Sequence, residues 1–192
     1  MTDTSAKIVS SEDECLILVD ENDNETGLLN KAACHDGDGA LHRAFSVFLF
    51  NKDGELLLQQ RASGKRLWPM FWSNSCCSHP RQGESIEVAT ERRLQDELHT
   101  NASLEYVYKF SYQAKYEELG SEHELCHVFL GLLEGIATRN ETEIEALRFV
   151  SANQLDEEFR TKPEIFTPWF LLEWQRLSSE FADTLARYTG SN

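Results

Sequence analysis

The segment from Trp68 to Pro80 contains residue types that could do chemistry. It reads WPMFWSNSCCSHP, so a thiol, Cys77, stands two residues before an imidazole, His79, among tryptophans and prolines. Alternate side chains of an extended chain share a face, so Cys77 and His79 are expected to point into one cavity near large aromatic rings. A free thiol beside a candidate metal ligand in an apolar setting suggests a reaction that must be shielded from water.

Other histidines and carboxylates could complete a metal site with His79. His35 and His42 lie seven residues apart in a Gly- and Asp-rich loop that leads into a predicted strand. Glu122 and Glu124 stand at the head of another predicted strand and would share one of its faces. Such a set suits Zn, Mn or Mg with more ligands than a closed structural zinc site has. Spacing alone leaves open the alternative that these residues are solvated loop and strand-edge side chains.

The residues after Pro80 predict a helix whose residue spacing matches a known sequence motif. Ser85 is a plausible cap, and residues 86–98 carry helix formers without Gly or Pro. The register matches most of the Nudix box, Gly-x5-Glu-x7-Arg-Glu-apolar-x-Glu-Glu-x-Gly, whose carboxylates hold Mg²⁺ against a diphosphate in hydrolases. The matching positions are Ser78 (at the first glycine), Glu84, Arg92, Leu94, Asp96 and Glu97.

Two departures from the box bear on its chemistry. Arg93 replaces a Glu, and His99 replaces the final Gly. Arg93 removes a metal-binding carboxylate and adds a cation, which argues against hydrolysis but is compatible with diphosphate binding. The alternative is a surface helix with the i,i+4 ion pairs Arg92–Asp96 and Arg93–Glu97.

A basic cluster precedes Trp68 in a chain that is otherwise acidic. Arg61, Lys65 and Arg66 lie in this cluster, whereas the whole chain has 33 acidic and 18 basic residues and a net charge of −15. Local positive charge in such a protein suggests an anion pocket, because the guanidinium fork suits phosphate. A solvated loop is the alternative.

Composition limits the classes of partner and compartment. A surface of net charge −15 repels nucleic acid and anionic membranes, so neither is an expected partner. The polar N-terminus resembles no signal peptide, and no apolar run is long enough to cross a bilayer. The five cysteines are odd in number and unpatterned, which favours a reducing cytoplasm over a disulfide framework.

The order of predicted elements indicates the fold class. Residues 1–13 are expected to be a disordered tail and residues 14–190 a single domain. The predicted strands are 15–19, 43–50, 55–61, 104–114, 124–133 and 146–150, and the predicted helices are 86–98, 152–160 and a terminal helix after Thr167-Pro168. This order predicts an α+β domain with αβα layers around a mixed sheet.

Five separated segments, in order, resemble type I isopentenyl-diphosphate Δ-isomerases, a branch of the Nudix fold that isomerises rather than hydrolyses. The segments are His35-x6-His42, Arg61–Pro69, Trp72–Pro80, Glu122–Cys126 and Thr167–Trp169. The similarity runs from about Leu16 to the last helix, and Arg93 in place of a box carboxylate agrees with it. The resemblance implies one Nudix-fold domain that interconverts isopentenyl and dimethylallyl diphosphate in isoprenoid biosynthesis. Separately, we expect a monomer or, alternatively, a dimer.

The resemblance also implies the roles of particular residues. One divalent metal (Mn²⁺, Zn²⁺ or Mg²⁺) would be held by His35, His42, His79, Glu122 and Glu124. Glu97 would help hold a Mg²⁺ that bridges to the substrate diphosphate, and the diphosphate itself would contact Arg61, Lys65 and Arg93. Cys77 and Glu124 would be the acid–base pair, with Tyr112 assisting and Trp169 over the carbon that becomes cationic.

Two other functions remain as alternatives. The first is a Nudix hydrolase acting on a prenyl or nucleoside diphosphate. The second is a metal-dependent binding protein that has kept the fold without the chemistry, although such a binder has no need of a proton-transfer pair.

Overall fold

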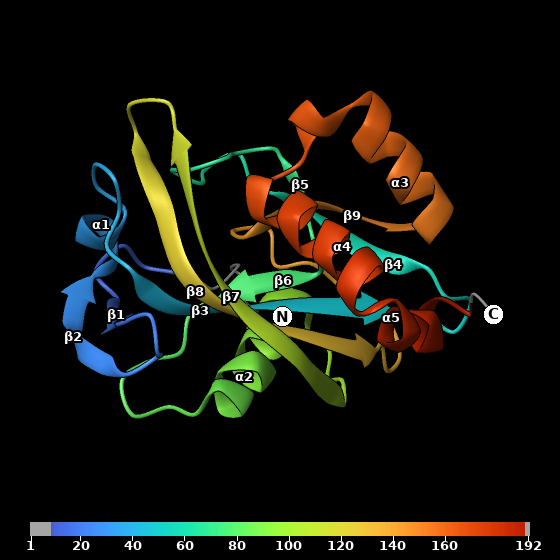
Figure 1. Ribbon diagram of the computed structural model, residues 1–192, viewed down its shortest axis with the longest axis horizontal. Coiled ribbons are helices and arrows are strands. Elements are labelled where there is room, and N and C mark those ends of the chain that lie inside the picture. The colour runs from blue at the N-terminus through green and yellow to red at the C-terminus, as the bar shows by residue number, and fades with distance from the viewer. Residues whose placement is uncertain (1–8, 191–192) are drawn as a thin grey trace, which may run out of the picture.

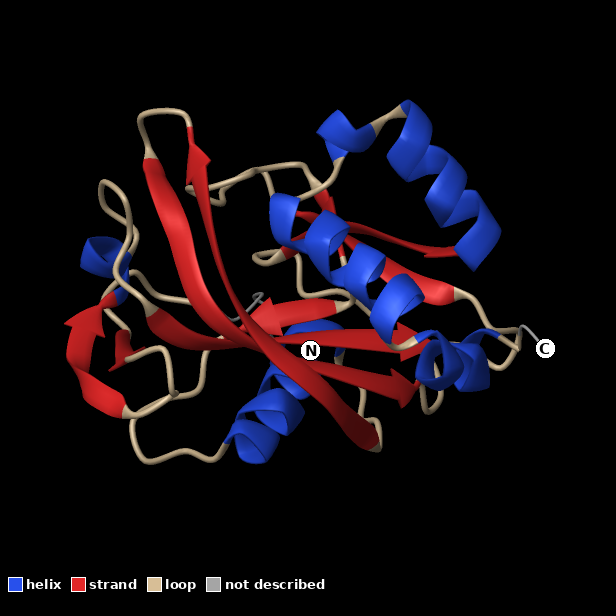
Figure 2. Ribbon diagram, in the orientation of Figure 1, coloured by secondary structure: helices blue, strands red, loops and turns tan. Residues whose placement is uncertain are grey.

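A mixed sheet of nine strands, with helices on both faces, organises the chain (Figures 1 and 2). The structure is a computed structural model that describes residues 9–190. Its elements are β1 Cys15–Val19, β2 Glu25–Asn30, α1 Lys31–Cys34, β3 His42–Phe50, β4 Leu56–Arg61, β5 Trp72–Ser73, β6 Cys76–Ser78, α2 Ile86–Leu98, β7 Leu104–Tyr116, β8 Gly120–Leu132, β9 Ile144–Val150, α3 Ala152–Thr161, a 3₁₀ helix Pro163–Ile165, α4 Pro168–Glu180 and α5 Ala182–Thr189. No helix within residues 9–190 is long and apolar enough to cross a membrane.

Strand β3 lies in the middle of the sheet and fixes which residues meet. It runs parallel to β8 and antiparallel to β6, while β8 forms a long antiparallel hairpin with β7. In this register His42 lies opposite Glu124, and Glu124 lies opposite Tyr112. On the other side of β3, Ser46 lies opposite Cys77. Residues from four strands thus become neighbours, although they are far apart in the sequence.

The alternation of β3 side chains creates a core on each side of the sheet. One core, beneath α2, contains Phe45, Val47 and Leu49 together with Ala89, Leu94 and Leu98. The other core, beneath α4, contains Ala44, Phe48 and Phe50 together with Phe170, Trp174 and Leu177. Figure 1 shows α2 on one side of the sheet and α4 on the other. The layered α+β fold predicted from the sequence is confirmed.

The structure differs from the predicted elements mainly before β3. Strand β2 and helix α1 occupy a stretch for which the sequence predicts no element, because β2 is a largely exposed hairpin strand without hydrophobic alternation. The ladder between β7 and β8 continues as far as Tyr116 and Gly120, so both strands are longer than predicted. The predicted terminal helix is interrupted at Phe181 and forms α4 and α5.

Helix α2 begins and ends with specific caps. The Ser85 hydroxyl accepts a hydrogen bond from the Val88 N–H at 3.3 Å, as the sequence predicts for an N-cap. His99 ends the helix in the left-handed region, with φ of +49°, where the box has Gly. The Nδ1 of His99 lies 2.9 Å from the carbonyl oxygen of Thr138. A hydrogen bond to a neighbouring loop therefore accompanies the unusual backbone conformation of this histidine.

The expected N-terminal tail, residues 1–13, lies mostly outside the described residues. From Val9 onward the chain contacts the domain. Val9 is buried, and its carbonyl oxygen accepts a hydrogen bond from Arg93 at 2.7 Å. The Ser10 hydroxyl oxygen lies 2.5 Å from the Nζ of Lys31. This segment therefore lies over one end of the cavity described below.

Gly120 is required where β8 begins beside α1. Its φ is +146°, and a Cβ there would collide with the carbonyl oxygen of His35. We expect Gly120→Ala to lower the free energy of unfolding by about 1–3 kcal/mol, measured by urea denaturation. Gly27→Ala is the control, because Gly27 has no positive φ and its Cβ would make only an ordinary contact. Equal losses in the two variants would contradict this account.

Candidate active site

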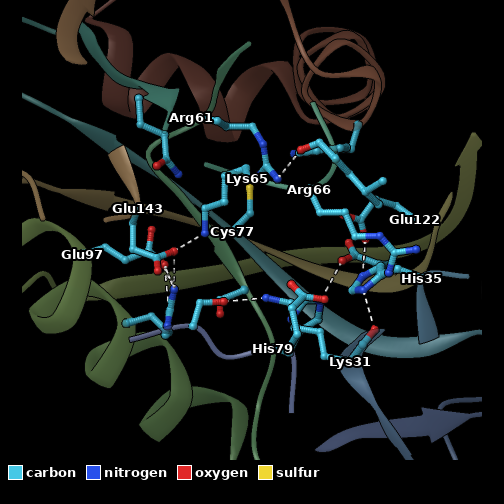
Figure 3. Close-up of a pocket in the computed structure, with 18 of the residues that line it drawn as sticks. Lys31, His35, Arg61, Lys65, Arg66, Cys77, His79, Glu97, Glu122 and Glu143 are labelled. Atoms are coloured by element: carbon cyan, nitrogen blue, oxygen red, sulfur yellow. Dashed lines mark hydrogen bonds and ion pairs between the residues drawn. The ribbon is translucent and has the colours of Figure 1, made fainter. Parts of the chain in front are cut away.

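One cavity brings together the residues predicted for metal binding, diphosphate binding and proton transfer (Figure 3). Every predicted site residue except His42 lines it. His42 is fully buried, with its Nε2 3.2 Å from the Nε2 of His79. In Figure 3 Cys77 lies between a Glu97–Glu143 side and a His35–Glu122 side. The expectation that Cys77 and His79 share a cavity is met because β6 is extended.

The histidines present their Nε2 atoms to one point. The Nδ1 of His35 lies 2.8 Å from the carbonyl oxygen of Lys31, and the Nδ1 of His42 lies 2.7 Å from that of Ala40. A carbonyl oxygen only accepts hydrogen bonds, so both Nδ1 atoms carry a proton, and each ring in its neutral form has its lone pair on Nε2. Backbone acceptors of this kind orient metal-binding histidines.

The contacts at this point fit a divalent cation. Ligand atoms of His35, His42, His79 and Glu122 all lie within 4.8 Å of one another. The Nε2 of His35 and an oxygen of Glu122 are 2.8 Å apart and buried, so they form an ion pair when His35 is protonated but face each other as two acceptors when it is neutral. Buried polar atoms without partners are costly in a folded protein. A divalent cation coordinated by imidazole nitrogens and a carboxylate would satisfy both buried atoms. The four residues could therefore hold a metal ion.

Glu124 connects the histidine cluster with Tyr112. One carboxylate oxygen lies 2.9 Å from the Nε2 of His79, and the other accepts the Tyr112 hydroxyl at 2.7 Å. Burial alone would raise the pKa of Glu124, but the contacts from His42 and His79 lower it well below its usual value. Burial and the Glu124 charge raise the pKa of Tyr112 well above its usual value. Tyr112 is therefore a neutral donor held against an ionised carboxylate.

Cys77 is a protonated thiol in the resting site. Its sulfur donates to the Oδ1 of Asn74 at 2.8 Å and lies 3.5 Å from the hydroxyl oxygen of Ser46. Burial, reinforced by the nearby carboxyl of Glu173, raises the pKa of the Cys77 thiol to about 12. A thiol with this pKa holds its proton at neutral pH and transfers it only to a group placed against it.

Trp169 covers the cavity from the first turn of α4. It is buried, and its indole N–H donates to the hydroxyl oxygen of Ser73 at 3.1 Å. Trp68 meets its ring edge to face, with centroids 5.2 Å apart. The guanidinium carbon of Arg61 lies 5.3 Å from the centroid of the Trp169 ring. The indole face is thus placed to attract positive charge.

The predicted diphosphate-binding side contains buried charges in pairs. Arg93 and Glu97 form an i,i+4 pair, with the Nε of Arg93 2.8 Å from a carboxylate oxygen. Lys65 forms an ion pair with Glu143, which also lies 3.4 Å from Arg93. Burial lowers the pKa of Lys65 against the attraction of Glu143. These cations are held inside the cavity rather than spread over the surface.

The sequence prediction missed three charged residues that line this cavity, Glu12, Lys31 and Glu143. Lys31 belongs to no recognisable sequence motif. Glu143 lies more than forty residues after α2 and belongs to no recognisable motif either. Arg66, the third member of the basic cluster predicted from the sequence, also lines the cavity. Its guanidinium is held by the carbonyl oxygens of Ala32 and Leu119. Glu12 precedes β1, Lys31 begins the short helix α1 and Glu143 precedes β9, so tertiary contacts rather than a local pattern bring them to the cavity.

Solved structures share this fold. DR0079 from Deinococcus radiodurans matches with a TM-score of 0.70 and 20% identity, covering 85% of this chain and 98% of that one. A MutT protein from Methanosarcina mazei matches with a TM-score of 0.59 and 14% identity, covering 73% and 95%. A family profile described as NUDIX domain matches residues 40–170. The fold and the α2 box therefore define a Nudix domain protein.

Curated relatives identify the family to which this Nudix domain protein belongs. The chain is 44% identical over 174 residues to isopentenyl-diphosphate Delta-isomerase 1 of Photorhabdus laumondii, covering 90% of this chain and 99% of the relative. It is 42% identical over 179 residues to the isopentenyl-diphosphate Delta-isomerase of Serratia proteamaculans, covering 93% and 99%. The chain belongs to the isopentenyl-diphosphate Delta-isomerase family, which confirms the family predicted from its sequence motifs.

Removal of one ligand should weaken metal binding without disturbing the fold. We expect Glu122→Gln to lower the affinity for a divalent metal at least about tenfold, measured by equilibrium dialysis with elemental analysis. His123→Ala is the matched control, because His123 follows Glu122 on β8 but faces away, with its Nδ1 3.2 Å from the carbonyl oxygen of Gly39. Unchanged affinity in Glu122→Gln would remove this carboxylate from the ligand set.

Proposed function

We propose that this chain interconverts isopentenyl and dimethylallyl diphosphate with Cys77 and the Tyr112–Glu124 pair as its two proton-transfer groups. The observation that carries the assignment is that all three residues line one cavity covered by Trp169. Membership of the isopentenyl-diphosphate Delta-isomerase family supports the reaction. The roles of the individual residues rest on the geometry of the cavity.

The reaction imposes demands that the residue types can meet. A proton adds to the terminal carbon of the alkene, giving a tertiary carbocation, and a proton then leaves the neighbouring methylene to form the new double bond. An isolated alkene is a very poor base, and water would capture the cation. The site must therefore exclude water and place one proton donor and one acceptor against the five-carbon unit.

Cys77 and the Tyr112–Glu124 pair supply these two groups. Since the reaction is reversible, the group that donates in one direction accepts in the other. The thiol of Cys77 is protonated at rest, and the Tyr112 hydroxyl is hydrogen-bonded to an ionised Glu124. The hydroxyl is thus a route by which a proton can reach or leave the substrate. The two groups belong to different strands, β6 on one side of β3 and the β7–β8 hairpin on the other.

Trp169 is proposed to stabilise the carbocation. An indole face attracts a cation without acting as a nucleophile, and a desolvated cation–π contact contributes about 2 kcal/mol or more. The guanidinium of Arg61 lies 5.3 Å from the centroid of this ring, so the indole face can take part in a cation–π contact. The flat ring also excludes water from the side of the cavity that it covers.

The basic residues are proposed to bind the diphosphate. Arg61, Lys65 and Arg93 line the cavity, and so does Lys31. A diphosphate would compete with the Glu143 and Glu97 carboxylates for these cations. Binding energy gained at this end anchors the flexible five-carbon tail at the reacting groups.

Two kinds of metal ion would complete the proposed site. The group His35, His42, His79, Glu122 and Glu124 would hold one divalent ion, Mn²⁺, Zn²⁺ or Mg²⁺, and Glu97 would help hold a Mg²⁺ at the diphosphate. When bound, the first supplies positive charge that tunes the acidity of a carboxylate, and the second neutralises phosphate charge. All the proposed ligands come from one chain, which supports a monomer as the working unit.

The ion pairs and positions of the Nudix box residues argue against hydrolysis. Arg93 stands in place of a box carboxylate and pairs with Glu97 inside the cavity. Glu84 lies in a bidentate pair with Arg92, with both distances 2.8 Å. Among the described lining residues, Glu97 is the only acidic residue of the box, which leaves few ligands for the metal cluster that a Nudix hydrolase needs.

Replacement of the thiol tests the proton-transfer assignment. We expect Cys77→Ala to lower kcat about 10²–10⁴-fold, because one acid–base group is lost, while folding and metal content stay near normal. The assay is proton NMR of isopentenyl diphosphate with enzyme and Mg²⁺ in D₂O. Deuterium entering the five-carbon unit with the diphosphate intact indicates isomerisation, and phosphate release would indicate a hydrolase. Cys76→Ala is the control, because Cys76 lies in the α2-side core.

Replacement of the indole tests carbocation stabilisation. We expect Trp169→Leu to lower kcat about thirtyfold, corresponding to about 2 kcal/mol of cation–π attraction, with KM changed less than about threefold. Trp169→Phe should retain part of the rate, because a phenyl face attracts a cation more weakly. Equal losses in kcat and in substrate affinity would mean that the ring only packs.

A further inference from the structure

Glu173 is a carboxyl group buried beneath the proposed reaction chamber. It lies on α4 one turn after Trp169 and has no exposed surface. Among the described residues no arginine, lysine or histidine forms an ion pair with it, and its Oε2 makes no hydrogen bond. An isolated buried carboxylate is very unfavourable, so such a group keeps its proton. No role proposed above uses this residue.

Burial favours the neutral form of Glu173, although two neighbouring groups oppose it. Its Oε1 lies 3.5 Å from the thiol of Cys126, and the hydroxyl of Ser46 is also within hydrogen-bonding range. Burial raises the pKa of Glu173 to about 8, while Ser46 and Cys126 oppose the shift. The titratable groups that face it are Cys77 from β6, Cys126 and Glu124 from β8, and Tyr108 from β7. All of them are neutral or negative, so none offers a positive charge to an ionised Glu173.

Ser46 links this carboxyl group to Cys77. Its hydroxyl oxygen lies 3.5 Å from the sulfur of Cys77 and 3.4 Å from that of Cys126. A serine hydroxyl has a single hydrogen to donate. An ionised Glu173 would attract that hydrogen in a charge-assisted bond, whereas a protonated Glu173 can donate to the Ser46 oxygen instead. The direction of the Ser46 hydroxyl therefore depends on whether Glu173 carries its proton.

We propose that Glu173 is a positioning residue for Cys77: in its protonated form it donates to Ser46, which leaves the Ser46 hydroxyl free to donate to the Cys77 sulfur. The proposal rests on the proposed function, in which Cys77 exchanges a proton with the substrate. A hydrogen bond to sulfur stabilises the negative charge that appears when the thiol gives up its proton. An ionised Glu173 would remove that bond and would also repel the developing thiolate.

Variants that separate charge, hydrogen bonding and volume test this proposal. Glu173→Gln stays neutral and can still donate, so we expect kcat within about threefold of wild type at neutral pH. Glu173→Leu cannot donate, and we expect kcat to fall about tenfold with KM unchanged, as for the loss of one hydrogen bond. Ser46→Ala should cause the same loss by removing the link. Glu180→Gln, an exposed change on the same helix, is the matched control.

The pH profile distinguishes positioning from packing. In the wild type, kcat should fall as Glu173 ionises, with a midpoint near pH 8, and this fall should be absent in Glu173→Gln. Infrared spectra in D₂O should show the carbonyl band of a protonated carboxylic acid in the wild type at neutral pH. The band should disappear as the pH rises through the same midpoint and should be missing in Glu173→Gln.

Three results would overturn the proposal. They are the absence of the infrared band at neutral pH, equal kcat in Glu173→Gln and Glu173→Leu, and a fall in kcat near pH 8 that persists in Glu173→Gln. If Glu173→Leu does not fold by circular dichroism, Ser46→Ala and the infrared spectra decide the question. A wild-type enzyme that does not isomerise isopentenyl diphosphate would instead defeat the proposed function, and the infrared band would still report the state of Glu173.

Discussion

The parallel register between β3 and β8 is the constraint on which the site depends. It places His42 opposite Glu124, and the β7–β8 hairpin then places Tyr112 on the other side of the same carboxylate. Side chains alternate along a strand, so a slip of one residue would turn Glu124 away from the cavity and bring His123 toward it. The apolar residues of β3 oppose such a slip, because the cores on both faces would have to exchange their side chains.

Charge is distributed unevenly across the cavity. Buried cations on the α2 side are matched by buried carboxylates, as in the Arg93–Glu97 and Lys65–Glu143 pairs. Buried ion pairs add little to stability because desolvation offsets their attraction, so their presence at a ligand cavity is better explained by binding. The internal carboxylates hold the cations in place, and in the proposed function a diphosphate with its own metal ion would replace these contacts without a large change in net buried charge.

The extent to which this site could be predicted depended on whether its residues formed local patterns. Cys77 and His79 alternate along a strand, and Ser85 caps a helix of regular composition, so both features could be inferred from sequence neighbours. Lys31 and Glu143 could not, because only tertiary contacts bring them to the cavity. Strand β2 lacks the alternation that marks half-buried strands. His99 adopts a conformation typical of glycine, which the chain tolerates through a contact with a distant loop.

The neutral residues of the cavity are as informative as the charged ones. A carbocation and a thiolate are both short-lived in the proposed reaction, and an uncompensated charge beside either would bias one step at the expense of the other. The groups that contact Cys77 include an amide and a hydroxyl, and burial raises the pKa of the nearby Glu173 carboxyl group to about 8. The ionised groups that border the chamber are Glu124, which accepts the Tyr112 hydroxyl, and Arg61, whose guanidinium lies over the Trp169 ring. Neutral groups thus contact the thiol, while charge lies at the second proposed proton-transfer group and beside the indole.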